Sequence, residues 1–557
     1  GASGQNLDRK FESSRLRQII PWCRQSLSTH LRAAGIAAKM IRLALSPERS
    51  VTMPADRANG ILLHPTSLPG LHGSGDLGPE AHRFLDWLHS AGQRLWQVLP
   101  LGPVGLGNSP YMGSSAFAGN PLLVDLAALG QAGWLTAEEL QPPVTKNPCR
   151  IDFEATGRYR MERLRSAARR FFAQADRAAM QAFQAFAQAE SEWLDDYCLF
   201  MALDGEHPGQ TWDRWPAALA TREPKVLQAA RARLAGECDF WRFTQWQFFQ
   251  QWHALKARAQ TLDIRIVGDV PIFVAHHSAD VWAHPELFEL DKHGRPTVVA
   301  GVPPDYFSAT GQRWGNPLFR WDQHRAEGYR WWRARMDQAL SLSDIVRIDH
   351  FRGFAAYWEI PAEAPNAIEG RWVPGPGAEL FEALRQDRTD LPIIAEDLGI
   401  ITPDVEALRD QFGLPGMRIL QFAFSGEADH AYLPHNYPAN TVAYTGTHDN
   451  NTLLGWWREA PERERAFAQH YLGSDGQAIQ WPLMRSLSQS VANHVIFPMQ
   501  DVLELGASER MNVPGVPLDN WAWRFEWDQV PYWLAAVLKD LAAAHGRAAF
   551  DGLRLPP

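Results

Sequence analysis

The chain has 557 residues, of which 45% are hydrophobic and 21% are charged, a composition typical of a globular protein with a large core. Its net charge of −9 and its pI near 6.1 count against nucleic acid as a partner, because phosphate-backbone binding depends on clustered Lys and Arg. No apolar run approaches the roughly 18 residues of a membrane span, and no secretory core follows the N-terminus, so no membrane contact is expected.

The four cysteines, Cys23, Cys149, Cys198 and Cys238, lie far apart and form no C-x-x-C pair. This spacing indicates neither a zinc site nor a disulfide framework. We therefore expect a cytoplasmic protein without a metal or another cofactor.

The first 52 residues differ from the rest of the chain, since they hold nine basic and three acidic residues, a net charge of +6. Met53 follows them as an alternative start, and Gly1-Ala2-Ser3-Gly4 resembles an expression scar. We interpret residues 1–52 as a tag, a leader or an upstream segment, and residues 53–557 as the catalytic part.

A strand at Ile61–His64, a loop rich in Pro and Gly, and a helix from Pro79 to Ala91 come next. The loop contains Gly73-Ser74-Gly75-Asp76-Leu77-Gly78, which matches the dinucleotide-binding pattern G-x-G-x-x-G. In that pattern the first Gly follows the strand directly, whereas here a segment with two prolines separates them. We therefore reject a dinucleotide-binding fold.

Eight segments have the continuous apolar character of buried parallel strands, and most are separated by helical patterns. They are Ile61–His64, Arg94–Leu99, Ile264–Val274, Asp344–Asp349, Pro392–Glu396, Met417–Phe422, Thr441–Thr445 and His494–Asp501. Eight such units predict an α/β fold, a (β/α)8 TIM barrel. A doubly wound open sheet is the alternative.

Two connections are too long for single crossover helices, and we interpret both as insertions in the barrel. In residues 101–263 an apolar face made of Phe240, Phe243, Trp246, Phe249 and Trp252 predicts a helical subdomain. Residues 275–343 contain a Pro-stiffened aromatic loop around Asp305-Tyr306-Phe307, which we expect to be a lid.

Acidic residues follow the predicted strands at the ends where barrel enzymes carry their chemistry. Asp269 lies in the third segment, Asp349 ends the fourth, Glu396 and Asp397 end the fifth, and His448-Asp449-Asn450 follows the seventh. Each acid alone could be a helix cap, a solvated group or half of a structural ion pair. Four of them in barrel order predict an active site.

Two acids on neighbouring strands suit exchange at a glycosidic bond with net retention. Asp349 would attack the anomeric carbon, and Arg347 would keep it ionised and lower its pKa through a charge-assisted hydrogen bond. Glu396 would be the general acid, which needs a raised pKa. Asp449, beside His448, would hold the sugar hydroxyls in the transition state.

A metal site is a competing use of the same groups, because Asp349, His350, Glu396, His448 and Asp449 could ligate zinc or manganese. The H-x-H and H-E-x-x-H spacings that place two ligands on one face are missing. The chain also has no G-x-S-x-G serine elbow and no phosphate-binding loop of the type G-x-x-x-x-G-K-[ST]. The 24 tryptophans are a weak hint of sugar binding, since most are expected in the core.

The chain resembles the amylomaltases, bacterial 4-α-glucanotransferases of glycoside hydrolase family 77 in the α-amylase clan, over about residues 59–527. The motifs that carry the resemblance are long and specific. They are His64 to Gly70, Asn108 to Tyr111, Gly268 to Val274, Val346 to Phe354, Ala395 to Gly399, Thr447 to Asn450, Glu509 to Gly515 and Asn520 to Arg524.

The resemblance implies that Asp349 is the nucleophile, Glu396 the acid/base and Asp449 the transition-state stabiliser, with Arg347 and His448 beside them. It also implies a set of substrate contacts, which are Tyr111, Asp269, Trp314, Asn512 and the flap residues Asp305, Tyr306 and Phe307. His277 departs from the family, which would be expected to have an acid there.

The implied reaction transfers an α-1,4-glucan segment from a malto-oligosaccharide or amylose donor to the 4-hydroxyl of another glucan or of glucose. The carboxylates alone do not separate this reaction from hydrolysis, since water and a sugar hydroxyl can both resolve a glycosyl-enzyme. A non-catalytic glucan-binding scaffold is the second alternative. The sequence does not predict the oligomeric state.

Overall fold

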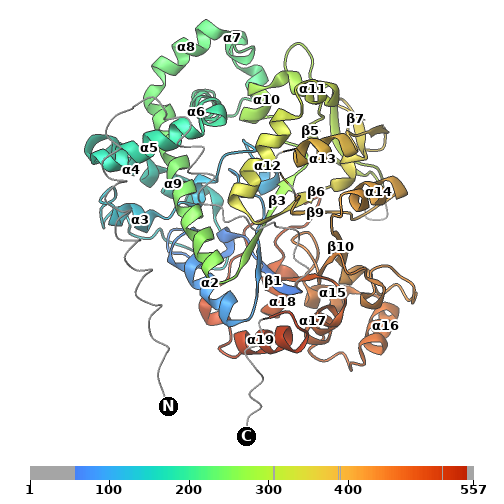
Figure 1. Cartoon of the computed structure of the whole chain (residues 1–557). Coiled ribbons are helices and arrows are strands. Elements are labelled where there is room, and N and C mark those ends of the chain that lie inside the picture. Colours follow the sequence, from blue (N-terminus) through green and yellow to red (C-terminus); the bar gives the residue numbers. More distant parts are fainter. Residues whose placement is uncertain (1–56, 305–307, 387, 389, 517, 549–557) are drawn as a thin grey trace, which may run out of the picture. The chain divides into compact units, whose positions relative to one another are not determined.

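The computed structural model describes residues 57–304, 308–386, 388, 390–516 and 518–548 (Figure 1). The predicted N-terminal extension, residues 1–52, and the predicted flap residues Asp305, Tyr306 and Phe307 lie outside them.

Eight parallel strands form the central sheet. Consecutive strands pair along the chain, except the fifth and sixth, which are the two ends of the sheet order, and the last strand pairs with the first. They are β1 (Ala58–Leu62), β2 (Leu95–Gln97), β3 (Arg265–Pro271), β6 (Ile345–Asp349), β9 (Ile393–Ala395), β10 (Gly416–Ile419), β11 (Thr441–Tyr444) and β12 (His494–Pro498). β1 pairs with both β2 and β12. The Ala395 N–H donates to Pro415 O at 2.9 Å, so β9 lies beside β10 and the ring of strands closes.

The predicted barrel is confirmed, and the doubly wound alternative is wrong because an open sheet would not bring its outer strands together. All eight predicted strands are present. All but β6 end earlier than predicted. In two of the predicted segments another element begins, since Leu420–Phe422 is a 3-10 turn and Met499–Val502 is the short helix α18. β12 ends at Pro498, which has no backbone N–H for the sheet ladder.

Helices cover the barrel between the strands (Figure 1). Outside the first long connection they are α2 (Pro79–Ser90), α10 (Ala279–Ala283), α11 (Trp321–Ala326), α12 (Arg330–Leu342), α13 (Ala378–Arg385), α14 (Pro403–Gln411), α15 (Leu453–Glu459), α16 (Glu462–Leu472), α17 (Gln480–Gln489), α18 (Met499–Val502) and α19 (Leu534–Ala544). Helix α2, the predicted Pro79–Ala91 segment, begins with a proline and buries Phe84, Leu85 and Leu88.

The loop with the G-x-G-x-x-G pattern contains Asp76, which forms an ion pair with Arg160. Arg160 donates to Asp76 Oδ2 at 3.1 Å, and the Gly78 N–H donates to Asp76 Oδ1 at 3.0 Å. Contacts within the protein therefore hold Asp76 and shape this loop.

The first long connection is helical, with α3 (Leu126–Gln131), α4 (Phe153–Gln174), α5 (Arg177–Ala189), α6 (Ser191–Glu206), α7 (Ala217–Ala220), α8 (Pro224–Arg233) and α9 (Ala235–Thr261). Figure 1 shows α4 to α8 gathered on one side, with α9 leading from them to the barrel. The five aromatic residues of the predicted apolar face of α9 are all buried. This stripe packs the helix into the core.

The second long connection contributes to an antiparallel sheet that the sequence did not reveal. Its strands, in the order β5-β4-β7-β8, are β4 (Val298–Val302), β5 (Gln312–Pro317), β7 (Ala356–Pro361) and β8 (Arg371–Pro374). β7 follows the 3-10 turn Phe351–Phe354 that leaves β6. The small sheet is therefore joined to the carboxyl end of a barrel strand.

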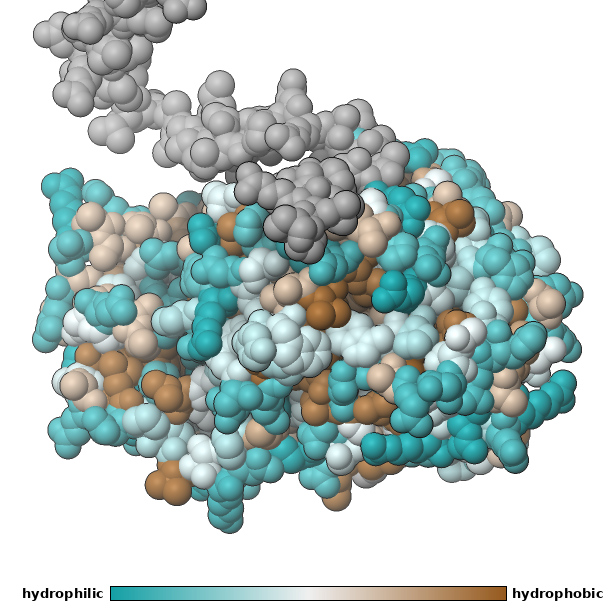
Figure 2. Space-filling model, turned by 90° about the horizontal axis from the view of Figure 1, so that it is seen from below, coloured by the Kyte–Doolittle hydropathy of each residue, from teal (hydrophilic) through white to brown (hydrophobic). Residues whose placement is uncertain are grey.

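Hydrophobic side chains on the face seen in Figure 2 occur in small groups between hydrophilic ones, as is usual for a surface in contact with water. Among the residues that the structure describes, no helix combines the length and the apolar character that crossing a bilayer requires.

Candidate active site

Strand register brings the predicted acids to one edge of the barrel. In the pairing of β3 with β6, Asp269 lies opposite Arg347, and Pro271 lies opposite Asp349. In the pairing of β6 with β9, Ile348 lies opposite Ala395. Asp349, the last residue of β6, and Glu396, the residue after β9, come next in the same register. Residues in register on parallel strands face the same side of the sheet. Both carboxylates therefore share the inner face.

Arg347 ties two of these acids together. It donates from Nη1 to both carboxylate oxygens of Asp269 at 2.8 Å and from Nη2 to Asp349 Oδ1 at 2.7 Å. The Arg347 and Asp269 side chains are buried, whereas 31% of the Asp349 side chain is exposed. Burial opposes the Arg347 cation, yet the charges of Asp269 and Asp349 outweigh burial and hold the pKa of Arg347 well above its ordinary value. Arg347 therefore holds Asp349 in place, and of these three side chains only that of Asp349 is partly exposed.

Glu396 has a different environment. It is buried, and its two oxygens accept the backbone N–H groups of His350 at 2.6 Å and Leu398 at 2.8 Å. Burial and the nearby charge of Asp349 raise the pKa of Glu396 to about 8, against the opposing influence of Arg347 and of the two N–H donors. Glu396 can therefore carry a proton at neutral pH.

His350 turns the chain at the end of β6. Its φ of 54° lies in the left-handed region, which costs a non-glycine residue free energy and is often found at functional sites. In this conformation its N–H reaches Glu396, and its ring meets the ring of Trp314 edge-on with centroids 4.8 Å apart. Burial lowers the pKa of His350 to about 4, so its ring is neutral at pH 7.

Asp449 lies in the loop after β11, and 47% of its side chain is exposed. Asn512 Nδ2 donates to Asp449 Oδ1 at 2.6 Å, and His448 Nε2 lies 3.3 Å from the same oxygen. The Asp449 backbone O accepts from Arg510 Nη2 at 2.8 Å, and the Asn512 N–H donates to His448 O at 3.1 Å. Two loops thus hold this carboxylate.

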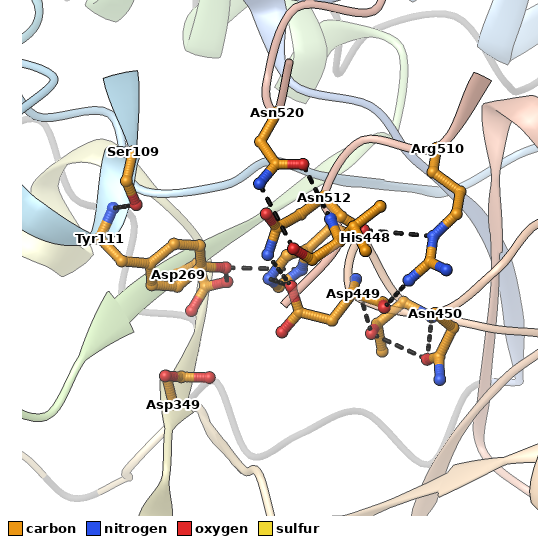
Figure 3. Close-up of polar contacts among 12 residues, drawn as sticks. Ser109, Tyr111, Asp269, Asp349, His448, Asp449, Asn450, Arg510, Asn512 and Asn520 are labelled. Atoms are coloured by element: carbon orange, nitrogen blue, oxygen red, sulfur yellow. Dashed lines mark hydrogen bonds and ion pairs between the residues drawn. The ribbon is translucent and has the colours of Figure 1, made fainter. Parts of the chain in front are cut away.

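Tyr111 connects the two groups of acids, as Figure 3 shows. Its hydroxyl donates to Asp269 Oδ2 at 2.7 Å and lies 3.5 Å from His448 Nδ1. The Tyr111 and His448 rings are stacked, with centroids 5.1 Å apart. Burial and the charge of Asp269 raise the pKa of Tyr111 well above its ordinary value, so the phenol stays neutral and keeps its proton for Asp269.

The structure brings together Asp349, Glu396, Arg347 and Asp269 on the strands, and Tyr111, His448, Asp449 and Asn512 on the loops. Trp314 reaches them from β5 through His350. Asp397, which the sequence placed beside Glu396, serves the barrel instead, since it accepts from Arg409 Nη1 and from the Met417 N–H, both at 2.6 Å. His277 bonds to Asp204 Oδ1 at 2.8 Å, so it packs on the helical connection.

Among the described residues, no group of three or more His, Cys, Asp and Glu side chains has the arrangement of a metal site. Contacts within the protein offset the negative charge of each neighbouring acid. Asp349 is paired with a cation, and Glu396 accepts backbone N–H groups.

Three residues with contacts in the loops around Asp449 were not singled out as site residues from the sequence. Arg510 and Asn520 lie in the motifs after β12, where Asn520 Oδ1 accepts the Val513 N–H at 2.9 Å. Asp501 ends the eighth predicted strand segment, a position that the strand-end argument could have selected. Its partners are backbone and hydroxyl groups far away in the sequence, which have no sequence signature.

A (β/α)8 barrel with a buried acid near a cation-paired carboxylate has the groups that retaining enzymes acting on glycosidic bonds require. Comparison with known proteins narrows this class. The family model described as 4-alpha-glucanotransferase, glycoside hydrolase family 77, matches residues 63–529.

A 4-alpha-glucanotransferase of Thermus thermophilus is 55% identical over 480 residues, which is 85% of this chain and 95% of the relative. A protein of the same name from Synechocystis is 48% identical over 499 residues, 89% of this chain and 99% of the relative. The amylomaltase of Streptococcus agalactiae, solved in complex with acarbose, superposes with a TM-score of 0.86 at 37% identity and covers 89% of this chain and all of its own. The chain belongs to the 4-α-glucanotransferase (amylomaltase) family, and the predicted resemblance is confirmed.

Proposed function

We propose that this chain transfers α-1,4-glucan segments with retention, through a covalent glycosyl-enzyme on Asp349. The observation that carries the mechanism is the contrast between two neighbouring carboxyl groups. Arg347 donates a hydrogen bond to Asp349, while burial and the charge of Asp349 raise the pKa of Glu396 to about 8. Two neighbouring carboxyl groups in such unlike environments can divide the roles of nucleophile and acid.

In the first step, Asp349 attacks the anomeric carbon while Glu396 protonates the oxygen of the departing glucan. The bond between Asp349 and the sugar then removes the negative charge of Asp349. That charge is one cause of the raised pKa of Glu396, so Glu396 becomes a stronger acid once the intermediate forms. Its carboxylate can then take the proton of the acceptor 4-hydroxyl, which displaces Asp349 and restores the starting state.

Asp449 would hold sugar hydroxyls as the ring flattens toward an oxocarbenium ion. Its exposed carboxylate keeps room for these hydroxyls beside the Asn512 bond. Tyr111, Asp269, Trp314 and Asn512 would line the substrate site. We keep Asp305, Tyr306 and Phe307, which lie outside the described residues, as proposed substrate contacts.

We assign malto-oligosaccharides and amylose as donors, and glucose or another glucan as acceptor. We also propose that residues 101–263 and 275–343 act as a helical and a lid-bearing insertion in a catalytic part that starts at residue 53. The free thiols of Cys149, Cys198 and Cys238 support a reducing cytoplasm as the place of action.

Product profiling on maltotriose tests the reaction. Transfer gives glucose together with maltopentaose and longer chains, and the number of reducing ends stays nearly constant. A steady rise in reducing ends without longer products would identify a hydrolase, and glucan binding without any products would identify a scaffold.

A further inference from the structure

The carboxylate of Asp501 is buried at the carboxyl end of β12 and has no part in the proposed reaction. It lies in α18, next to Gln500, and only 2% of the residue is exposed. Burial raises the pKa of Asp501 to about 6, so at pH 7 the group is an anion and both oxygens can accept hydrogen bonds.

The two oxygens of Asp501 hold the two ends of one loop. Oδ2 accepts the hydroxyl of Thr445 at 2.6 Å, and Oδ1 accepts the N–H of Leu453 at 2.7 Å. Thr445 directly follows β11, and Leu453 is the first residue of α15, whose N–H groups have no partner within the helix. Both residues are fully buried. The seven residues between these anchors include His448 and Asp449.

The second loop that holds Asp449 is tied to the same short helix. Gln500 Nε2 donates to Glu509 O at 3.3 Å, close to Asn512, which donates to Asp449 Oδ1 at 2.6 Å. Adjacent residues of α18 therefore fix both loops that meet at the Asp449 carboxylate.

We propose that Asp501 is a positioning residue for Asp449, and that it sets the place of this carboxylate by fixing both ends of the loop 446–452. This inference rests on the proposed role of Asp449. With only 2% of the residue exposed, Asp501 would act through Asp449 and not by contact with the substrate. It acts because a displacement of about 1 Å of a group that meets the transition state lowers the rate by roughly a hundredfold.

The first test compares three variants in maltotriose disproportionation. Asp501→Ala removes both hydrogen bonds, and we expect kcat to fall about 10- to 100-fold while KM changes less than about threefold. Asp501→Asn retains most of the activity, because its carbonyl can accept from Leu453 and its amide can donate to the Thr445 hydroxyl. Thr445→Val removes one bond and reduces kcat by an intermediate factor. Thr445→Val also replaces Asp501→Ala in this comparison if the alanine variant does not fold.

The matched control is Asp344→Ala. Asp344 directly precedes β6 and therefore lies at the end of the barrel opposite the site. Its Oδ2 accepts the Ile266 N–H at 2.8 Å. We expect kcat per folded molecule to equal that of the parent, with a lower Tm. A loss of kcat in this variant as large as in Asp501→Ala would overturn the assignment, because general loosening of the barrel would then explain both.

The decisive test is a double-mutant cycle with Asp449→Asn. If Asp501 acts through Asp449, we expect Asp501→Ala to lower kcat by less than about threefold in the Asp449→Asn background. Thr445→Val takes its place in the cycle if the alanine variant does not fold. An equal factor in both backgrounds would overturn the inference. That result leaves the proposed function intact as long as the parent enzyme disproportionates maltotriose. A parent without transfer products would contradict the proposed function itself.

Discussion

The two sides of the active site are built from different kinds of structure. Asp269, Arg347, Asp349 and Glu396 lie on or directly after adjacent strands, where sheet register sets their positions. Asp449 lies on a loop, half exposed, and side chains from another loop hold it. The strand side fixes the groups that make and break bonds, whereas the loop side holds a group that must follow a changing sugar ring. The predictions below separate these two roles.

Replacement of Asp349 should have the largest effect. Asp349→Asn removes the nucleophile and the negative charge that faces Arg347, so we expect kcat for maltotriose to fall roughly 10⁵-fold. Asp344→Asn, at the opposite end of the same strand, should keep the parent rate. Loss of turnover with retained glucan binding, measured by calorimetry, would support chemistry at Asp349, and residual activity above about 1% would exclude it as the nucleophile.

Glu396→Gln should depend on the leaving group. With maltotriose, whose departing oxygen needs a proton, we expect a loss of about 10³- to 10⁴-fold. With α-maltosyl fluoride, whose fluoride departs without a proton, formation of the glycosyl-enzyme should fall by less than about 30-fold. Rapid-quench measurement of the intermediate gives both values. Equal losses on the two donors would mean that Glu396 is not the acid.

Asp449→Asn tests the loop side. The amide keeps the shape but cannot stabilise developing positive charge, so we expect kcat to fall about 10²-fold with little change in KM. Both half-reactions pass through the same kind of transition state and should slow together. If KM rises and kcat is unchanged, Asp449 binds the ground state and not the transition state.

The pH profile reports on the strand side through Glu396. Its pKa is raised to about 8 in the folded protein, so the acid stays protonated below that pH and loses its proton above it. We expect kcat/KM for maltotriose to fall about tenfold per pH unit above roughly 8. The same profile with α-maltosyl fluoride should lack this alkaline limb. An alkaline limb shared by both donors would assign it to another group.

The strand side was the more predictable of the two from sequence. Asp349 and Glu396 each follow an apolar strand segment, and the closed order of eight strands places both at one edge. Asp397 shows the limit of this reasoning. It follows Glu396 directly, just after β9, yet it faces Arg409 and the Met417 N–H, so its place after a strand does not by itself mark a site residue.

The loop side could be predicted only in part. The strand-end argument selected His448 and Asp449, and the resemblance added Asn512. Nothing in the sequence shows that Asp501 reaches Thr445 and Leu453, since these contacts depend on closure of the barrel. The antiparallel sheet was missed for another reason. β5, Gln312–Pro317, contains Gly315, Asn316 and Pro317, residues that are uncommon in strands. Pairing with β4 overrides this low propensity.

Tyr111 gives the finest test of the comparison, because its hydroxyl touches both sides of the site. Tyr111→Phe keeps the ring stacked on His448 but removes the hydrogen bond to Asp269. Since Arg347 still donates to both oxygens of Asp269, the carboxylate remains paired, and we expect only about a fivefold loss of kcat/KM for maltotriose. Combined with Asp449→Asn, the Tyr111 effect should shrink if the hydroxyl acts through His448 on the loop side. It should persist unchanged if it acts through Asp269 on the strand side, so the double-mutant cycle tells which half of the site the tyrosine serves.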